Sequence, residues 1–73
     1  MAIVNVKSEI AGNVWKILTK PGDKVEAEGE LMILESMKME IPVLSPKGGT
    51  IKEIKVAEGE AIAEGQLVAI IDG

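Results

Sequence analysis

The 73-residue sequence predicts an all-β domain, built as either a barrel or a sandwich. Apolar residues alternate with polar ones or run in short blocks between glycines and prolines, and helical periodicity is weak throughout. The two halves of the chain also resemble each other, as expected for two copies of one structural unit. Six or more short strands with turns between them are typical of barrels and sandwiches.

Turn-forming residues separate the expected strands. KPGD at Lys20–Asp23 has Pro and Gly in the order that a type II turn requires. AEGE occurs at Ala27–Glu30 and again at Ala57–Glu60, and SPKGG fills Ser45–Gly49. The strands expected between these turns are Ile3–Val6, Gly12–Leu18, Leu31–Leu34, Met39–Leu44, Thr50–Val56 and Leu67–Ile71.

The internal repeat begins at Gly12 in the first half and at Gly49 in the second. Each copy has a glycine in the turn after its first strand, Gly22 or Gly59, and we expect a positive φ at both. With one extra residue in the first half, the copies continue to match: Gly29 with Gly65, Leu31 with Leu67 and Ile33 with Ala69.

The repeat also predicts where the chain ends lie. The second copy ends at Gly73, at the point where the first copy reaches Met37. The turn between Glu35 and Glu40 therefore corresponds to the chain ends. A two-fold axis would place Lys38 at one end of the domain and the termini near the opposite end.

The composition excludes several functions. The length fits one domain, residues 1–73, and a hydrophobic content of 47% argues against disorder. The absence of His and Cys excludes disulfides and His-based zinc or catalytic sites, so we expect no metal. Eight scattered lysines and a net charge of −4 argue against nucleic-acid binding, and no apolar run could span a membrane. We expect a cytoplasmic monomer.

The stretch ESMKME at Glu35–Glu40 is the main candidate functional site. It must turn the chain, yet it has none of the residues that favour tight turns. Its central residue, Lys38, has a methionine on each side, Met37 and Met39. A lysine at such a tip is a mobile amine that an external enzyme could deprotonate and acylate. We expect the other seven lysines to be solvated surface charges, and Met32 to fill the core.

At these residues the chain resembles the biotinyl and lipoyl carrier domains. Glu35-Ser36-Met37-Lys38-Met39 is similar to the Glu-Ala-Met-Lys-Met of biotin carriers, in which the lysine holds biotin. The resemblance implies a flattened β-barrel of two antiparallel sheets, the barrel-sandwich hybrid. The glycines also lie where the family has them: Gly12, Gly22, Gly29, Gly49, Gly59 and Gly65.

The resemblance implies that Lys38 is the site of covalent biotin attachment, with Glu35, Ser36, Met37 and Met39 as its recognition residues. A biotin protein ligase would acylate the lysine. The side chain would then act as a swinging arm that carries a carboxyl group from a biotin carboxylase to a carboxyltransferase. The chain itself would not be catalytic.

Two departures from the family pattern affect this interpretation. Biotin carriers usually have Ala where this chain has Ser36, whereas lipoyl domains commonly read Glu-Ser-Asp-Lys-Ala. Lipoate, attached by a lipoyl ligase, is therefore an alternative modification. In addition, ILTKPGDKV runs directly from strand to turn, without the protruding "thumb" of many bacterial carriers. The chain is therefore similar to stand-alone, thumbless carriers.

Two further alternatives belong to other functional classes. An unmodified barrel could serve as a protein-binding module, which would not require a lysine at the tip. An enzyme could use a Ser36–Lys38 dyad or a Glu35–Glu40 carboxylate pair. The small size of the domain argues against an enzyme, because it leaves little room for a substrate cavity.

Overall fold

A computed structural model describes residues 2–73, which contain eight strands and no helix. Nowhere in this part of the chain is there a helix long and apolar enough to cross a membrane. The strands are β1 (Ile3–Lys7), β2 (Gly12–Ile17), β3 (Lys24–Val25), β4 (Glu30–Ser36), β5 (Met39–Leu44), β6 (Gly49–Ile54), β7 (Ala61–Ile62) and β8 (Leu67–Asp72).

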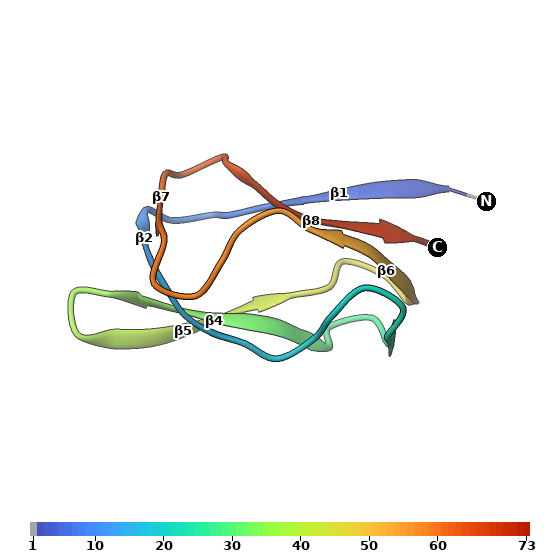
Figure 1. Cartoon of the computed structure of the whole chain (residues 1–73), viewed down its shortest axis with the longest axis horizontal. Coiled ribbons are helices and arrows are strands. Elements are labelled where there is room, and N and C mark those ends of the chain that lie inside the picture. Colours follow the sequence, from blue (N-terminus) through green and yellow to red (C-terminus); the bar gives the residue numbers. More distant parts are fainter. Residues whose placement is uncertain (1) are drawn as a thin grey trace.

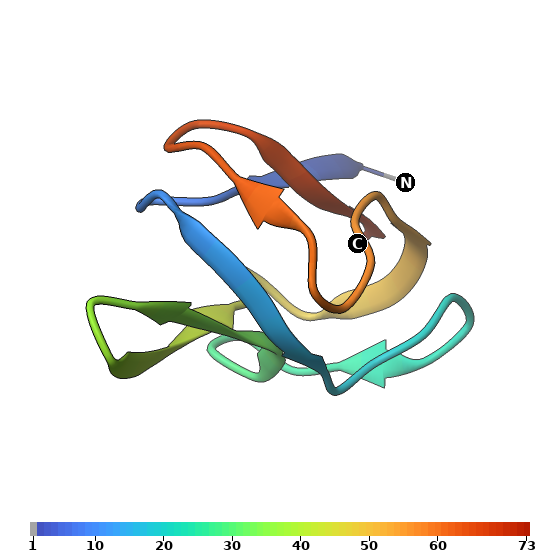
Figure 2. The same ribbon diagram turned by 60° about the vertical axis from the view of Figure 1, so that its left-hand side comes forward.

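The strands form two antiparallel sheets that face each other across the core (Figures 1 and 2). One sheet has the order β1-β8-β6-β3, and the other has the order β5-β4-β2-β7. The predicted all-β fold is therefore confirmed, and the two antiparallel sheets match what the family resemblance implied.

All six expected strands are present, but two further strands were missed. Lys24–Val25 and Ala61–Ile62 form the two-residue strands β3 and β7. Two residues are too few to show an alternating pattern in the sequence. Both strands are nevertheless important to the fold, because each pairs with a strand of the other half of the chain, β3 with β6 and β7 with β2.

Two expected strands were drawn too long at their ends. β2 stops at Ile17 instead of Leu18, and β6 stops at Ile54 instead of Val56. Val56 is only 8% exposed, because it packs into the core from the loop that follows β6. The apolar side chain of Val56 therefore suggested a continued strand. It is apolar because it is buried, although it lies in a loop.

The pseudo-two-fold symmetry is confirmed, and it relates residues that lie 37 positions apart. Val14 of β2 pairs with Leu34 of β4, and Ile51 of β6 pairs with Ile71 of β8. The pairing register shifts at the same point in both, directly after Val14 and directly after Ile51. Exchanging the two halves converts the strand order of one sheet into that of the other.

The expectation that the first half contains one extra residue is wrong. Gly65 corresponds to Glu28 and not to Gly29, because Glu28 and Gly65 hold the same positive φ, +67° and +84°. The first half simply has a glutamate where the second has a glycine. The strands that follow match accordingly, Leu31 with Val68 and Ile33 with Ile70. The turns close with equivalent hydrogen bonds: Gly29 N–H donates to Glu26 O (2.9 Å), and Gln66 N–H donates to Ala63 O (3.1 Å).

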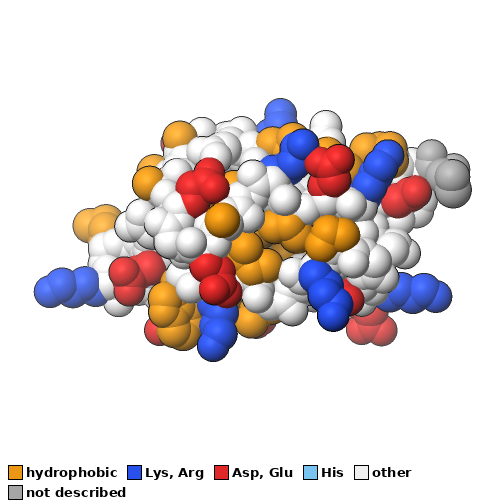
Figure 3. Space-filling model, viewed as in Figure 1, with side chains coloured by type: hydrophobic (Ala, Val, Ile, Leu, Met, Phe, Trp, Pro, Cys, Tyr) orange, Lys and Arg blue, Asp and Glu red, His pale blue; other side chains and the backbone are white. Residues whose placement is uncertain are grey.

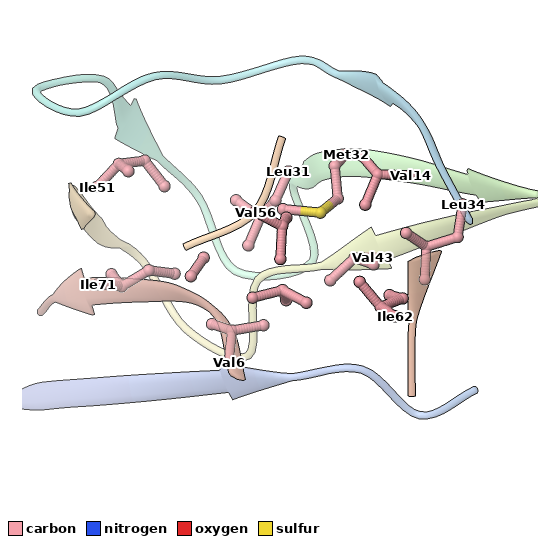
Figure 4. Packing of buried hydrophobic residues seen from close by; sticks show 12 residues of the cluster. Val6, Val14, Leu31, Met32, Leu34, Val43, Ile51, Val56, Ile62 and Ile71 are labelled. Carbon is pink, nitrogen blue, oxygen red and sulfur yellow. The ribbon is translucent and has the colours of Figure 1, made fainter. Parts of the chain in front are cut away.

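The core takes equivalent side chains from both halves (Figure 4). Met32 of β4 is fully buried, as predicted, and lies beside Leu31 of the same strand and Val14 of β2. Burial of such aliphatic side chains is the main favourable contribution to folding. The equivalent pairs with at most 1% exposure are Val14 and Ile51, Leu31 and Val68, Met32 and Ala69, and Leu34 and Ile71.

The hairpin and the termini lie at opposite ends of the domain, as the repeat predicted (Figures 1 and 2). The domain measures 36 × 18 × 18 Å. At the terminal end, Ala2 N–H donates to Gly73 O (3.1 Å) and Gly73 N–H donates to Ala2 O (2.8 Å). This pair of residues is equivalent to the pair Ser36 and Met39, which closes the β4–β5 hairpin at the other end.

Gly22 and Gly59 have positive φ, +97° and +87°, as the sequence predicted. In the first of these turns, Asp23 N–H donates to Lys20 O (3.1 Å), which fits the expected type II turn. A Cβ added at Gly22 would meet no atom within 4 Å, so steric contact does not explain the glycine. The backbone conformation does, because it is unfavourable for residues with a Cβ.

We predict that Gly22→Ala lowers the free energy of unfolding by about 1 kcal/mol, through backbone strain alone. For a domain of this size the melting temperature should fall by roughly 4–8 °C. Gly48→Ala is the matched control, since its Cβ would meet its nearest neighbour at an ordinary 3.5 Å. Thermal unfolding followed by circular dichroism measures both, and equal melting temperatures would contradict the role assigned to φ.

Candidate functional site

The candidate site is the tip of the β4–β5 hairpin. Ser36 pairs with Met39, so Met37 and Lys38 alone form the loop between the strands. Both have positive φ, +53° and +67°. This is the pattern of a type I′ turn, which usually has Asn-Gly at these positions. A residue with a Cβ is disfavoured there by about 1 kcal/mol.

The tip presents apolar surface to solvent around the amine. Met37 is 89% exposed and Met39 is 57% exposed, and Lys38 is also exposed. In Figure 3 a basic side chain projects at the hairpin end of the domain, with apolar side chains close to it. Methionine is flexible and polarizable, so such a surface can adapt to a partner. The arrangement makes Lys38 accessible to an enzyme from several directions.

The hairpin is held firmly at its base. β4 lies between β5 and β2, and its residue Leu34 is buried in the core. β2 also approaches the hairpin closely at Gly12, where an added Cβ would lie 2.6 Å from Glu35 O and 3.3 Å from Ser36 Cβ. Only glycine permits this approach. The base is therefore fixed by packing, whereas Met37 and Lys38 at the tip are exposed to solvent.

Two carboxylates face each other just below the tip. Glu35 and Glu40 are cross-strand partners, and both are exposed. Like charges directly opposite each other are mildly destabilising, so this pair is not explained by stability. Because both side chains are on an open surface, the geometry does not enclose a substrate between them. The carboxylate-pair enzyme considered from the sequence therefore gains no support.

The structure brings all five sequence-predicted site residues, Glu35 to Met39, into this one hairpin. None of them lines the cavity of about 200 Å³ that lies beside β5. That cavity is lined by Lys7, Glu9, Ile10, Leu34, Ile41, Pro42, Val43 and Leu44. The positive φ of Met37 and Lys38 was not predicted from the sequence. The only related signal was that a stretch which must turn the chain lacks the residues that favour tight turns.

A rigid barrel that presents one lysine on a projecting hairpin defines a carrier domain. Comparison with known proteins identifies the family. The chain matches the biotin/lipoyl family described as "Biotin-requiring enzyme" over residues 2–71, and it belongs to that family.

Two similar proteins are themselves small. The chain is 45% identical over 65 residues to the "Biotin/lipoyl attachment protein" of Bacillus subtilis (strain 168), covering 89% of each chain. It is 39% identical over 67 residues to the "Biotinylated protein TB7.3 homolog" of Mycobacterium leprae (strain TN), covering 92% of this chain and 94% of that one. The resemblance inferred from the hairpin motif is therefore confirmed.

The fold also agrees with a solved structure. The urea carboxylase of Kluyveromyces lactis contains a region that superposes with a TM-score of 0.93 at 35% sequence identity. The match covers 99% of this chain and 6% of that much longer one. The same barrel thus occurs as a small part of a large carboxylase.

We predict that Lys38→Gly raises the free energy of unfolding by roughly 0.5–1 kcal/mol, because glycine is preferred at the second position of a type I′ turn. Lys38→Arg is the matched control and should leave stability unchanged, since arginine has the same backbone preference as lysine. Urea unfolding measures both. A Lys38→Gly protein less stable than the wild type would show that the turn is not strained by the lysine.

Proposed function

We propose that the protein is a biotin carrier and that Lys38 is the residue on which biotin is held. The observation that carries this proposal is the tip turn, in which Met37 and Lys38 occupy two positions that favour Asn-Gly. A turn with no function would be expected to relieve that strain. A turn that must carry a side-chain amine cannot relieve the strain by adopting Asn-Gly, because neither of these residues has such an amine.

The residues of the hairpin fit such a group. Lys38 supplies a primary amine, and an amide bond would form between its Nζ and the biotin carboxyl carbon. The acyl donor would be biotinyl-adenylate, with AMP as the leaving group. Only a neutral amine has the lone pair that attacks the acyl carbon, so the proton that Nζ loses passes to the ligase or to solvent. Once attached, biotin supplies a site for a transferable carboxyl group.

The remaining residues of this chain position the group and do not take part in the chemistry. The fixed hairpin base holds the backbone of Lys38 in one place, while the lysine side chain supplies reach. We propose that the partners are a biotin protein ligase, which loads the lysine, and the biotin carboxylase and carboxyltransferase that the arm visits. The likeness to part of a urea carboxylase supports this assignment.

Lipoate is a second candidate modification, and one observation favours it. The sequence before the lysine begins Glu35-Ser36, as in lipoyl domains, and the similar Bacillus subtilis protein is named for both cofactors. Met37 argues for biotin, because lipoyl domains have Asp at this position. A ligase site built for an apolar methionine would have to desolvate that charge at a cost.

We predict that Lys38 is the only biotinylated residue. Lys38→Arg should abolish modification, because arginine stays protonated and cannot act as the nucleophile. The measurement is intact mass, with a site-mapping digest, after incubation with biotin, ATP and a biotin protein ligase. The seven remaining lysines are the internal control. A biotin adduct on the Lys38→Arg protein would refute the assignment.

We also predict that the two methionines decide which cofactor is attached. Met37→Asp combined with Met39→Ala should reduce biotinylation and increase lipoylation, since the variant has the lipoyl pattern around Lys38. Intact mass after separate incubation with a biotin ligase and a lipoyl ligase measures the balance. If wild type and variant are biotinylated equally fast, the methionines do not determine specificity.

A further inference from the structure

Five apolar side chains lie on the outer side of the sheet that carries the hairpin. Their position follows from the pairing: Ile33 is paired with Pro42 on one side and with Lys16 on the other. The residues before and after Ile33 are buried in the core, so Ile33 points outwards. This apolar face consists of Trp15, Leu18, Ile33, Pro42 and Leu44. Ile33 is partly exposed and the other four are exposed.

The pseudo-symmetry provides an internal comparison for this face. The outer side of the opposite sheet has the same backbone, so each residue of the apolar face has an equivalent 37 positions away. Apart from the pair Ile33 and Ile70, every equivalent is polar. Trp15 corresponds to Lys52, Leu18 to Lys55, Pro42 to Asn5 and Leu44 to Lys7.

The fold therefore does not require apolar residues at these positions. On the opposite sheet the equivalent surface is solvated, and Lys55 Nζ donates to Glu53 Oε2 at 2.7 Å. That hydrogen bond lowers the pKa of the Glu53 carboxyl below its ordinary value. On the hairpin sheet, Trp15 is 49%, Leu18 44% and Leu44 43% exposed. Exposed large apolar side chains that the fold does not need indicate an interaction surface.

The surroundings of the face define its partner. The charged residues around the face are mostly acidic. Glu30 is paired with Leu44, Glu35 is paired with Glu40, and Glu9 lines a cavity with Pro42 and Leu44. Two lysines also lie there: Lys16 is paired with Ile33, with its Nζ 5.7 Å from the centre of the Trp15 ring, and Lys7 lines the same cavity as Glu9. A complementary surface would be apolar at its centre and basic at its border. The partner must also bind through side chains. Pro42 lies in β5, an edge strand, and has no N–H to offer an added strand.

Part of the face belongs to the two strands that Lys38 connects. β4 and β5 contribute Ile33, Pro42 and Leu44 and then continue into the hairpin. A partner seated on the face therefore has Lys38 at one edge of its contact. The opposite, polar surface belongs to the sheet whose strands β1 and β8 pair beside the chain ends, far from the lysine.

We propose that the apolar face is the docking surface for the ligase that acylates Lys38, and this inference rests on the proposed function. The ligase is the enzyme that needs such a surface. It meets the protein before any cofactor is attached, so it must recognise protein alone and select one of eight exposed lysines. Enzymes that act later can recognise the attached group itself.

The test exchanges residues for their own pseudo-equivalents, which the fold already accommodates. Trp15→Lys and Leu44→Lys are made separately, and steady-state biotinylation is measured with biotin, ATP and a biotin protein ligase. Each should raise the KM for the carrier about tenfold, with kcat within about twofold, because docking and not chemistry is weakened. The wild-type KM should also rise with salt, through screening of the acidic border.

Ile3→Glu is the matched control. Ile3 is 52% exposed, similar to Trp15, but it lies on the other sheet, and its pseudo-equivalent is Glu40. It should leave KM unchanged. Melting temperatures identify any variant that fails to fold, and Leu44→Lys then replaces Trp15→Lys as the test.

Two results would overturn the inference. The first is that Trp15→Lys and Leu44→Lys both fold and have the same KM as Ile3→Glu. The other is normal biotinylation of the variants combined with slower carboxyl loading by a biotin carboxylase, which would assign the face to that enzyme. Failure of the proposed function is distinct from both, because the wild-type protein would then not be biotinylated at all.

Discussion

The structure depends on one constraint, which is that neither half of the chain can bury its apolar side chains alone. β2 and β4 of the first half lie in one sheet with β7, while β6 and β8 of the second half lie in the other sheet with β3. The two shortest strands thus join each sheet to the opposite half. Equivalent residues such as Val14 and Ile51 meet in one core. Loss of either half would expose the apolar side of the other.

This closed core explains how a small domain can hold a strained turn. Met37 and Lys38 are on the side of the hairpin furthest from the core, and their unfavourable backbone geometry is imposed by the pairing of Ser36 with Met39. The close approach of β2 at Gly12 fixes the strands from behind. Rigid strands and a free tip are complementary, because a carrier must place its lysine reproducibly while leaving the side chain mobile.

Much of this organisation was predictable from sequence. Alternation and turn residues identified every strand of five or more residues, and the motif around Lys38 identified the hairpin. The two-residue strands were missed because they are too short for periodicity. The alignment of the halves failed at Glu28, since matching by identity placed glycine against glycine, whereas the backbone conserves a positive φ. The apolar face was missed for a related reason: its members become neighbours only through strand register, which the sequence does not state.

The pairing of Ala2 with Gly73 has a consequence for how such a domain can be joined to other proteins. Both chain ends leave the barrel at one point, and the lysine lies at the other end of its long axis. A polypeptide attached at either end, or at both, would hold the barrel at the end of its long axis that lies furthest from Lys38. The domain could then rotate as a unit about a single attachment point, and the distance swept by the lysine would include the length of the barrel as well as the length of its side chain.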